Sequence, residues 1–105
     1  MSVGDFGNPS AYAERVLAVV VQIPTGRVMS YGDIAEFMGE GSARGVGRVL
    51  FRWGSDVPWQ RVVMAGGAPK PHGSDEHLAR LRYEGTPLSS DGSRVDMVQA
   101  RWDGR

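Results

Sequence analysis

The chain has 105 residues, 41% of them hydrophobic and 23% charged, with 12 basic residues, 12 acidic residues and no cysteine. This length and balance predict one globular domain over residues 1–105 and exclude an intrinsically disordered chain. The lack of cysteine excludes disulfides, thiolate-bound zinc and a cysteine nucleophile.

No hydrophobic run is long enough to span a bilayer, and the first residues lack the basic-then-apolar pattern of a signal sequence. We therefore expect an intracellular protein with no membrane contact, cytoplasmic and nucleoid-associated in a bacterium or nuclear in a eukaryote. No heptad pattern or obvious apolar patch indicates an oligomer, so a monomer is expected.

The charges are unevenly distributed along the chain. Residues 1–41 hold two arginines and five carboxylates (net −3), whereas residues 42–61 hold four arginines and one carboxylate (net +3). Eleven of the 12 basic residues are arginine, which favours planar, bidentate contacts such as those made with nucleic acids. Arginine-rich codon usage in a GC-rich genome would produce the same bias.

Two helices are predicted in the first 41 residues. Residues 8–23 read as a helix capped by Asn8, with Pro9 at its first position and apolar residues on one face. A second, short helix begins after Ser30, where Asp33 completes a variant of the capping box. The segment 39–41, Gly-Glu-Gly, predicts a tight turn after it.

A third helix is predicted over residues 42–52, with Ser42 as its cap, and it completes a helix-turn-helix. Arg44, Arg48 and Arg52 recur every four residues and therefore share one face, while the other face is apolar. This arrangement suits a helix that faces nucleic acid. A solvated arginine face on an ordinary surface helix fits the spacing equally well.

The second half of the chain predicts the remaining parts of a winged helix. Residues 61–65 read as a strand, and residues 75–84 read as a helix that Ser74 caps and Gly85 ends. Asp91-Gly92 lies between two β-compatible segments and gives a weak hairpin signal.

The histidines do not indicate a metal site. His72 and His77 lie five residues apart across a helix start, which does not align two imidazoles, so we read them as a loop histidine and a helix-surface histidine. No phosphate-binding loop, dinucleotide fingerprint or serine-histidine-aspartate signature is present, and neither a metal nor a cofactor is expected.

Two aromatic residues have both structural and functional interpretations. Tyr31 follows a helix cap, where it can half-bury its ring or offer its hydroxyl to a phosphate near the helix N-terminus. Trp59, between Pro58 and Arg61, is either a core residue or a recognition residue at the start of the predicted strand.

Four sequence blocks together resemble a known family. In chain order they are GRVMSYGDIAEFMG, SARGVGRVL, VPWQRVV and LRYEG, and they resemble the DNA-binding domain of O6-alkylguanine-DNA alkyltransferases. The similarity is greatest to the non-enzymatic alkyltransferase-like proteins and runs over about residues 10 to 85. It implies an α+β, mostly helical, winged helix-turn-helix domain, with the helix-turn-helix at about 30–52 and the signature block at 58–61.

In the alkyltransferases the signature block reads Pro-Cys-His-Arg, and its cysteine accepts the alkyl group. Here Trp59 stands at the cysteine position, as in one branch of the alkyltransferase-like proteins, and Gln60 stands where the family usually keeps histidine. Transfer requires a thiolate and an activating base, so the resemblance implies a protein that is not an enzyme. The indole can instead pack against an alkylated base and exclude water.

The resemblance also assigns roles to single residues. Arg44 matches the arginine finger that fills the gap left by an extruded base, and Tyr31 matches the tyrosine that acts on the flipped nucleotide's phosphate. Glu84 matches a glutamate that supports the pocket by hydrogen bonding, and the loop 68–73 should form one pocket wall. With helix 42–52 in the minor groove, the expected DNA-binding residues are Tyr31, Ser42, Ala43, Arg44, Gly45 and Arg48. The expected alkylguanine pocket comprises Tyr31, Trp59, Arg61, Val62, Met64, Pro71, His72 and Glu84.

The expected function is therefore recognition of DNA damage. The protein should bind O6-alkylguanine in double-stranded DNA by minor-groove docking and base flipping, without alkyl transfer, and flag the lesion to nucleotide excision repair proteins. Gln60 and Trp53, which replaces an asparagine of many alkyltransferases, depart from the family and alter the expected pocket. The alternatives are a winged-helix regulator of undamaged sequence and an enzyme of another kind, such as a glycosylase.

Overall fold

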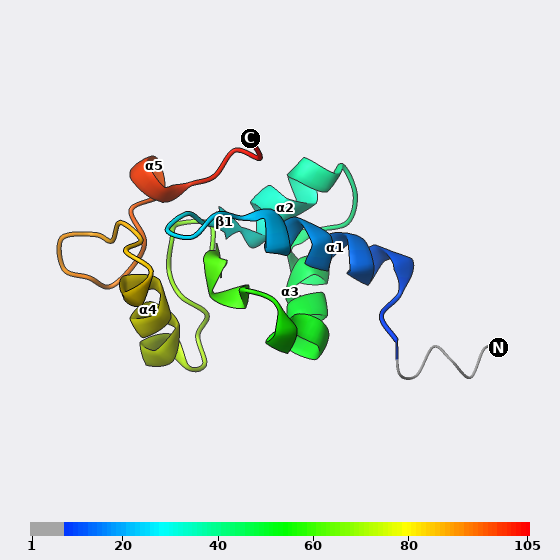
Figure 1. The fold of residues 1–105 in the computed structure, drawn as a ribbon, viewed down its shortest axis with the longest axis horizontal. Helices are drawn as coiled ribbons and strands as arrows, with labels where there is room; N and C mark the ends of the chain where they lie inside the picture. The colour runs from blue at the N-terminus through cyan, green and yellow to red at the C-terminus, as the bar shows by residue number, and fades with distance from the viewer. Residues whose placement is uncertain (1–7) are drawn as a thin grey trace.

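The computed structural model of the protein describes residues 8–105. Figure 1 shows the three N-terminal helices on one side of the molecule, α4 and α5 on the other, and the short strands between them. The helices are α1 (Ala11–Gln22), α2 (Tyr31–Met38), α3 (Ala43–Trp53), α4 (Ser74–Tyr83) and α5 (Met97–Ala100). The strands are β1 (Met29–Ser30) and β2 (Val62–Val63), and two 3₁₀ turns, η2 (Gly54–Asp56) and η3 (Trp59–Arg61), connect α3 to β2.

Local capping chemistry fixes where the first helices begin. The predicted capping box of α2 is confirmed, because Ser30 Oγ accepts from the Asp33 backbone N–H at 2.9 Å and Asp33 Oδ2 accepts from the Ser30 N–H at 3.0 Å. The predicted cap of α1 is wrong. Ser10, two residues after Asn8, is the N-cap, and its Oγ accepts from the Ala13 N–H at 3.1 Å.

A two-stranded parallel pair joins the halves of the chain. Met29 pairs with Val62 and Ser30 pairs with Val63, so the start of α2 lies beside the end of the signature block. The predicted strand 61–65 is shorter than expected, because Arg61 ends η3 and a turn begins at Ala65. An isolated parallel bridge from Val28 to Arg101 brings the C-terminal segment beside the residue that precedes β1.

Two hydrophobic clusters hold the fold together. The larger lies among α1, α2 and α3, and the smaller lies beneath α4 and the C-terminal segment. Buried members of the larger cluster are Ala13, Val16, Val19, Val20, Ile23, Met29, Ile34, Val46, Val49, Val62 and Trp102. Those of the smaller are Val28, Val63, Leu81, Val95 and Ala100. Burial of these side chains is the main favourable contribution to folding.

The predicted hairpin is reduced to one bridge. Leu88 and Val95 face each other in antiparallel orientation around the Asp91-Gly92 turn, but the chain then forms α5 instead of a second strand. The segment after α5 packs on the domain, since Trp102 is buried and lies 6.4 Å, ring centroid to ring centroid, from Phe37 on α2. Within residues 8–105, no helix is long and apolar enough to cross a membrane.

Candidate nucleic-acid interface

Helix α3 presents a basic face away from the core. Ser42 is its N-cap, as predicted, and the Ser42 Oγ accepts from the Gly45 N–H at 3.1 Å. The predicted apolar face is anchored by buried Val46 and Val49, which leaves Arg44, Arg48 and Arg52 exposed to solvent. Neither Arg44 nor Arg48 has an ion-pair partner among residues 8–105.

Tyr12 fixes the start of α3 against α1. A Cβ placed on Gly41 or Gly45 would lie 2.5 Å or 2.8 Å from the Tyr12 hydroxyl oxygen, closer than side-chain carbons approach. Gly41 also has a positive φ of 76°, which L residues rarely adopt. Both positions therefore require glycine for the ring to pack here, and this contact holds the first turn of α3, which carries Arg44, against α1.

A cavity of about 480 Å³ opens beside the basic helix. Gly47, Leu50 and Gly54 form one stripe along α3 and the following turn and make up one of its walls. A Cβ on Gly47 would lie 3.9 Å from the Tyr31 ring and one on Gly54 would lie 3.7 Å from the Trp59 Cβ, so both aromatic residues lie at ordinary contact distance from this stripe. The full lining is Tyr31, Gly47, Leu50, Phe51, Gly54, Ser55, Trp59, Lys70, Pro71 and His72.

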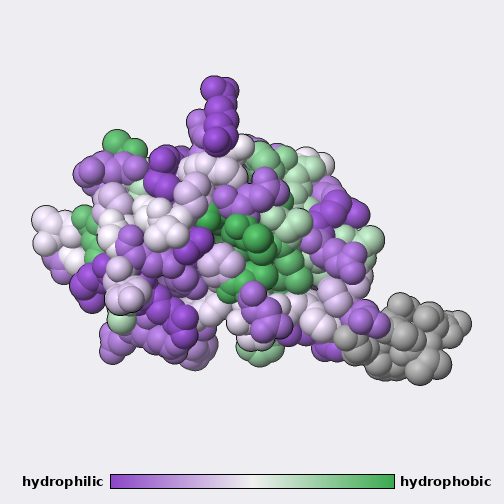
Figure 2. Space-filling model, viewed as in Figure 1, coloured by the Kyte–Doolittle hydropathy of each residue, from purple (hydrophilic) through white to green (hydrophobic). Residues whose placement is uncertain are grey.

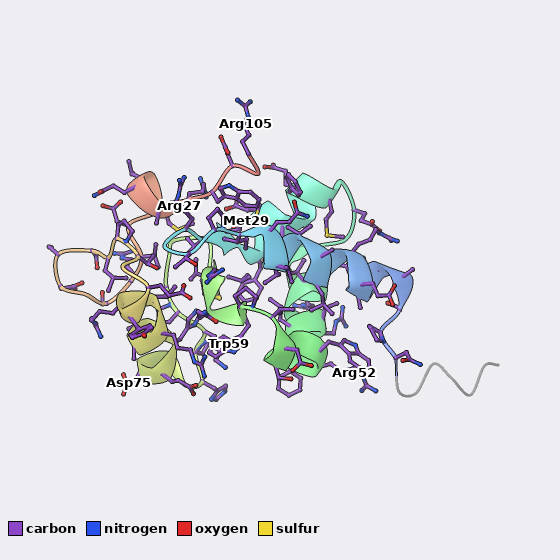
Figure 3. All side chains as sticks on the ribbon, viewed as in Figure 1. Arg27, Met29, Arg52, Trp59, Asp75 and Arg105 are labelled. Carbon is purple, nitrogen blue, oxygen red and sulfur yellow. The ribbon has the colours of Figure 1, made fainter. Side chains whose placement is uncertain are left out.

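Trp59 lies between α3 and α4, as Figure 3 shows. Its indole meets the imidazole of His77 edge to face, and two cations lie against the ring. Lys70 Nζ is 4.4 Å and Arg80 Cζ is 5.2 Å from the ring centroid, both within the range of a cation–π interaction. Trp59 is half-buried, so part of its surface remains available to a ligand in the cavity.

Glu84 holds two residues of the signature block by hydrogen bonds. It accepts hydrogen bonds from Gln60 Nε2 at 2.8 Å and from Arg61 Nε and Nη2 at 3.1 Å and 2.9 Å. Burial opposes the ionisation of Glu84, but these hydrogen bonds outweigh it and lower its pKa below the ordinary value. Arg61 also donates to the carbonyl of Ile23 and to Thr25, which ties the block to the end of α1.

His77 is a site residue that the sequence analysis missed. It was expected on the surface of its helix, but it is fully buried. Its Nδ1 accepts from the Lys70 backbone N–H at 3.0 Å, and its Nε2 lies 2.9 Å from the Gln60 carbonyl oxygen. A neutral imidazole protonated at Nε2 satisfies both contacts. Burial, the largest cause, lowers the His77 pKa, and the neighbouring charge of Lys70 lowers it further.

The helix that carries His77 also begins differently from the prediction. Gly73, at a φ of 76°, is the N-cap of α4, and Ser74 is the first helical residue instead of the cap. Figure 2 shows mostly hydrophilic residues over α4 on the visible face. Because most residues of α4 are polar or charged, the sequence does not reveal its inward face, where His77 and Leu81 lie four residues apart and are both buried.

Family membership follows from comparison with known proteins. Residues 11–86 match the family described as the DNA-binding domain of 6-O-methylguanine DNA methyltransferase. The chain belongs to this family. It is 39% identical over 98 residues to a DNA base-flipping protein of Escherichia coli (strain K12), covering 89% of this chain and 75% of that protein. It is 33% identical over 81 residues to alkyltransferase-like protein 1 of Schizosaccharomyces pombe, covering 70% and 75%.

Solved structures of family members share the fold. The S. pombe Atl1 in complex with damaged DNA containing O6-carboxymethylguanine matches with a TM-score of 0.77 and 28% identity, over 90% of this chain and 97% of that one. The O6-methylguanine methyltransferase of Mycobacterium tuberculosis matches with a TM-score of 0.65 and 30% identity, over 78% and 54%. The predicted family and the predicted α+β winged helix-turn-helix fold are thereby confirmed.

The structure brings together only part of the pocket expected for this family. Tyr31, Trp59, Pro71 and His72 line the cavity with the basic helix beside them, and burial raises the pKa of Tyr31. The other four expected pocket residues do not line the cavity. Val62 is fully buried in the larger core cluster, Met64 is exposed beyond β2, and Arg61 and Glu84 form a salt bridge with each other.

The other expected DNA-binding residues lie at the N-cap and along the first half of α3. Ser42, Ala43, Arg44 and Arg48 are exposed and Gly45 is partly buried. Phe51, which the sequence analysis did not select, is 95% exposed at the edge of the cavity. Among residues 8–105, no group of three or more histidine, aspartate or glutamate side chains could hold a metal ion.

Proposed function

We propose that this protein recognises O6-alkylated guanine in duplex DNA by receiving the flipped base in the cavity beside α3. The observation that carries the proposal is the position of Trp59, which lines a cavity of about 480 Å³ next to a face of exposed arginines. An arginine face matches the charge of the phosphate backbone, and an aromatic cavity matches a base taken out of its stack. The similarity to proteins named for base flipping and for binding damaged DNA supports it.

Preference for the lesion follows from the energetics of flipping. Extruding a base costs a few kcal/mol, and the cost is least for a base that is already weakly paired. An O6-alkyl group removes the N1 proton that guanine uses in pairing, so the alkylated base starts nearer the flipped state. Stacking on an aromatic side chain contributes about 1–3 kcal/mol per base, which offsets much of the remaining cost.

The site keeps groups that can recognise an alkylated base but lacks the thiol needed for alkyl transfer. The chain has no cysteine, and Trp59 occupies the position of the family's acceptor cysteine. Since no alkyl group is removed, the bound complex acts as a signal. We propose that it recruits nucleotide excision repair proteins to the lesion, in the cytoplasm of a bacterium or the nucleus of a eukaryote, and that the protein shields the lesion from alkyltransferases meanwhile.

Equilibrium binding tests this function directly. The protein is titrated with two duplexes that differ only by one O6-methylguanine in place of guanine, at one fixed salt concentration because phosphate contacts are salt-dependent. We expect tighter binding to the lesion duplex and an unchanged protein mass. Equal binding to both duplexes would favour a winged-helix regulator, and release of free base or a mass increase would indicate an enzyme.

A further inference from the structure

The cavity contains a positive charge and no negative one. Lys70 enters its lining from the loop between β2 and α4, and its ammonium group lies 4.4 Å from the centroid of the Trp59 ring. No carboxylate is among the described residues that line the cavity, and Lys70 forms no salt bridge within residues 8–105. An unpaired ammonium in a mostly apolar cavity is a binding site for an anion.

The surrounding residues hold Lys70 in this position. Pro69 and Pro71 flank it and restrict the backbone on both sides. Its own N–H donates to the buried His77 Nδ1 at 3.0 Å, which fixes the loop against α4. A Cβ on Gly73 would lie 3.6 Å from Lys70 Cε, so the lysine chain already passes that glycine at contact distance. The backbone of Lys70 is therefore fixed before any ligand binds, which reduces the entropy lost on binding.

We infer that Lys70 selects O6-substituents that carry a negative charge, such as the carboxymethyl group, over neutral substituents of the same size. This inference rests on the proposed function, because the flipped base brings its O6-substituent to Trp59. A neutral alkyl group at Trp59 must displace the ammonium from the ring or leave it unpaired. A carboxylate forms a charge-assisted hydrogen bond with the ammonium while the cation stays over the indole.

Lys70 differs in this respect from the other cations near the site. Arg80 also lies against the Trp59 ring, but it pairs with Glu76 at 3.0 Å and is not part of the cavity lining. His72 lines the cavity and is exposed at its mouth. The charge that a substituent meets inside the cavity is therefore that of Lys70.

The test compares a charged substituent with its neutral isostere. Three duplexes of one sequence carry O6-carboxymethylguanine, O6-carbamoylmethylguanine or guanine, and the dissociation constant of each is measured at the same salt concentration. The carbamoylmethyl amide keeps the size and shape of the carboxymethyl group and removes its charge. We expect the wild-type protein to bind the carboxymethyl duplex about tenfold more tightly than the carbamoylmethyl duplex, the effect of one charge-assisted hydrogen bond.

Two variants assign the effect to Lys70. Lys70→Met keeps the length of the side chain without its charge and should abolish the preference, whereas Lys70→Arg should retain most of it. Any change in non-specific phosphate binding cancels in the ratio of the two lesion duplexes, because both are measured with the same variant. A wild-type ratio near one, or an equal ratio in Lys70→Met, would overturn the inference. Failure of the proposed function would be a different result, namely equal binding to either lesion and to guanine.

Discussion

The imidazole of His77 meets the indole of Trp59 edge to face, with the ring centroids 5.3 Å apart and the ring planes inclined by 61°. Both imidazole nitrogens are occupied at the same time, one by the backbone N–H of Lys70 and the other by the carbonyl of Gln60. A single buried side chain thus joins the cavity loop, the signature block and α4. It is a positioning residue for Trp59, since it acts on the cavity through its neighbours.

Replacing His77 by glutamine or leucine separates its hydrogen bonding from its bulk. The glutamine amide can accept from Lys70 and donate to Gln60, so His77→Gln should keep the lesion preference of the wild type. His77→Leu leaves two buried backbone groups without a hydrogen-bond partner, which costs about 1–3 kcal/mol of stability for each group. This variant should therefore have a lower melting temperature and should lose most of the lesion preference. Thermal unfolding and binding to the matched duplexes check both. Equal lesion preference in His77→Leu and the wild type would contradict the positioning role.

The buried imidazole also predicts how stability depends on pH. Burial lowers the His77 pKa in the folded protein, so in acid the unfolded chain binds a proton at this histidine that the folded protein does not bind. Lys70 also lowers this pKa, whereas the hydrogen bond to Gln60 and the charge of Glu76 oppose the shift. The free energy of unfolding should therefore decrease as the pH falls below the ordinary histidine pKa of about 6.5. In melting curves at pH 7.5 and 5.5, His77→Gln should lose less stability than the wild type, and equal losses would contradict this account.

Arg44 should contribute more to lesion binding than its charge alone. It is the second residue of α3 and is exposed, at a position that Tyr12 packing against Gly41 and Gly45 fixes. If it enters the gap left by the flipped base, Arg44→Ala should weaken binding to the lesion duplex by about 10- to 100-fold. Arg105→Ala removes the same charge at a site far from α3, as Figure 3 shows by comparison with Arg52, and should have little effect. Equal losses of affinity in the two variants would show that Arg44 contributes only non-specific charge to binding.

Local chemistry accounts for the parts of the fold that the sequence predicted. Ser30 with Asp33, and Ser42 before α3, satisfy backbone donors within three residues, so their effect can be recognised without tertiary information. The helix-turn-helix follows from these caps and the intervening glycines. The cap of α1 was misassigned because Asn8 and Ser10 are both good capping residues, and only the backbone conformation distinguishes them.

Contacts between distant segments account for what the sequence did not reveal. Strand β2 lies within the predicted strand 61–65, but β1 has only two residues and pairs with it across about 30 positions, so no local pattern indicates β1 or the pairing. His77 stands among charged residues on α4, and its burial depends on partners at positions 60 and 70. The resemblance to the family identified Trp59 and the loop 68–73 as a pocket wall, but it did not single out Lys70 of that loop, whose ammonium lies over the Trp59 ring.

Trp59 should determine discrimination between alkylated and normal guanine. Trp59→Ala removes the aromatic surface on which the alkylated base packs, so the ratio of affinities for lesion and guanine duplexes should fall by about tenfold or more. Trp59→Phe keeps a smaller aromatic surface and should give an intermediate ratio. The measurement is the same pair of binding curves for each variant, with thermal unfolding as the control for folding. Equal loss of affinity for both duplexes would show that Trp59 supports the fold and not the choice of base.

Restoring the cysteine should not by itself restore rapid alkyl transfer. In Trp59→Cys the nearby charges of Lys70 and Arg80 favour a thiolate, but neither of the neighbours Gln60 and His77 is available to take its proton. Gln60 cannot act as a base, and both nitrogens of His77 are already hydrogen-bonded. A histidine introduced by Gln60→His would stand where Glu84 already accepts a hydrogen bond at 2.8 Å, and that carboxylate could orient it.

The double variant Trp59→Cys with Gln60→His should therefore react about 100-fold faster than Trp59→Cys, the lower range of a general-base contribution. The measurement follows the intact protein mass over time after mixing with a duplex that contains O6-methylguanine, where transfer adds one methyl group. Gln60→His alone is the matched control and should show no mass increase, because it has no thiol. If the single cysteine variant reacts as fast as the double variant, then the two cations suffice to activate the thiol and position 60 does not limit the chemistry.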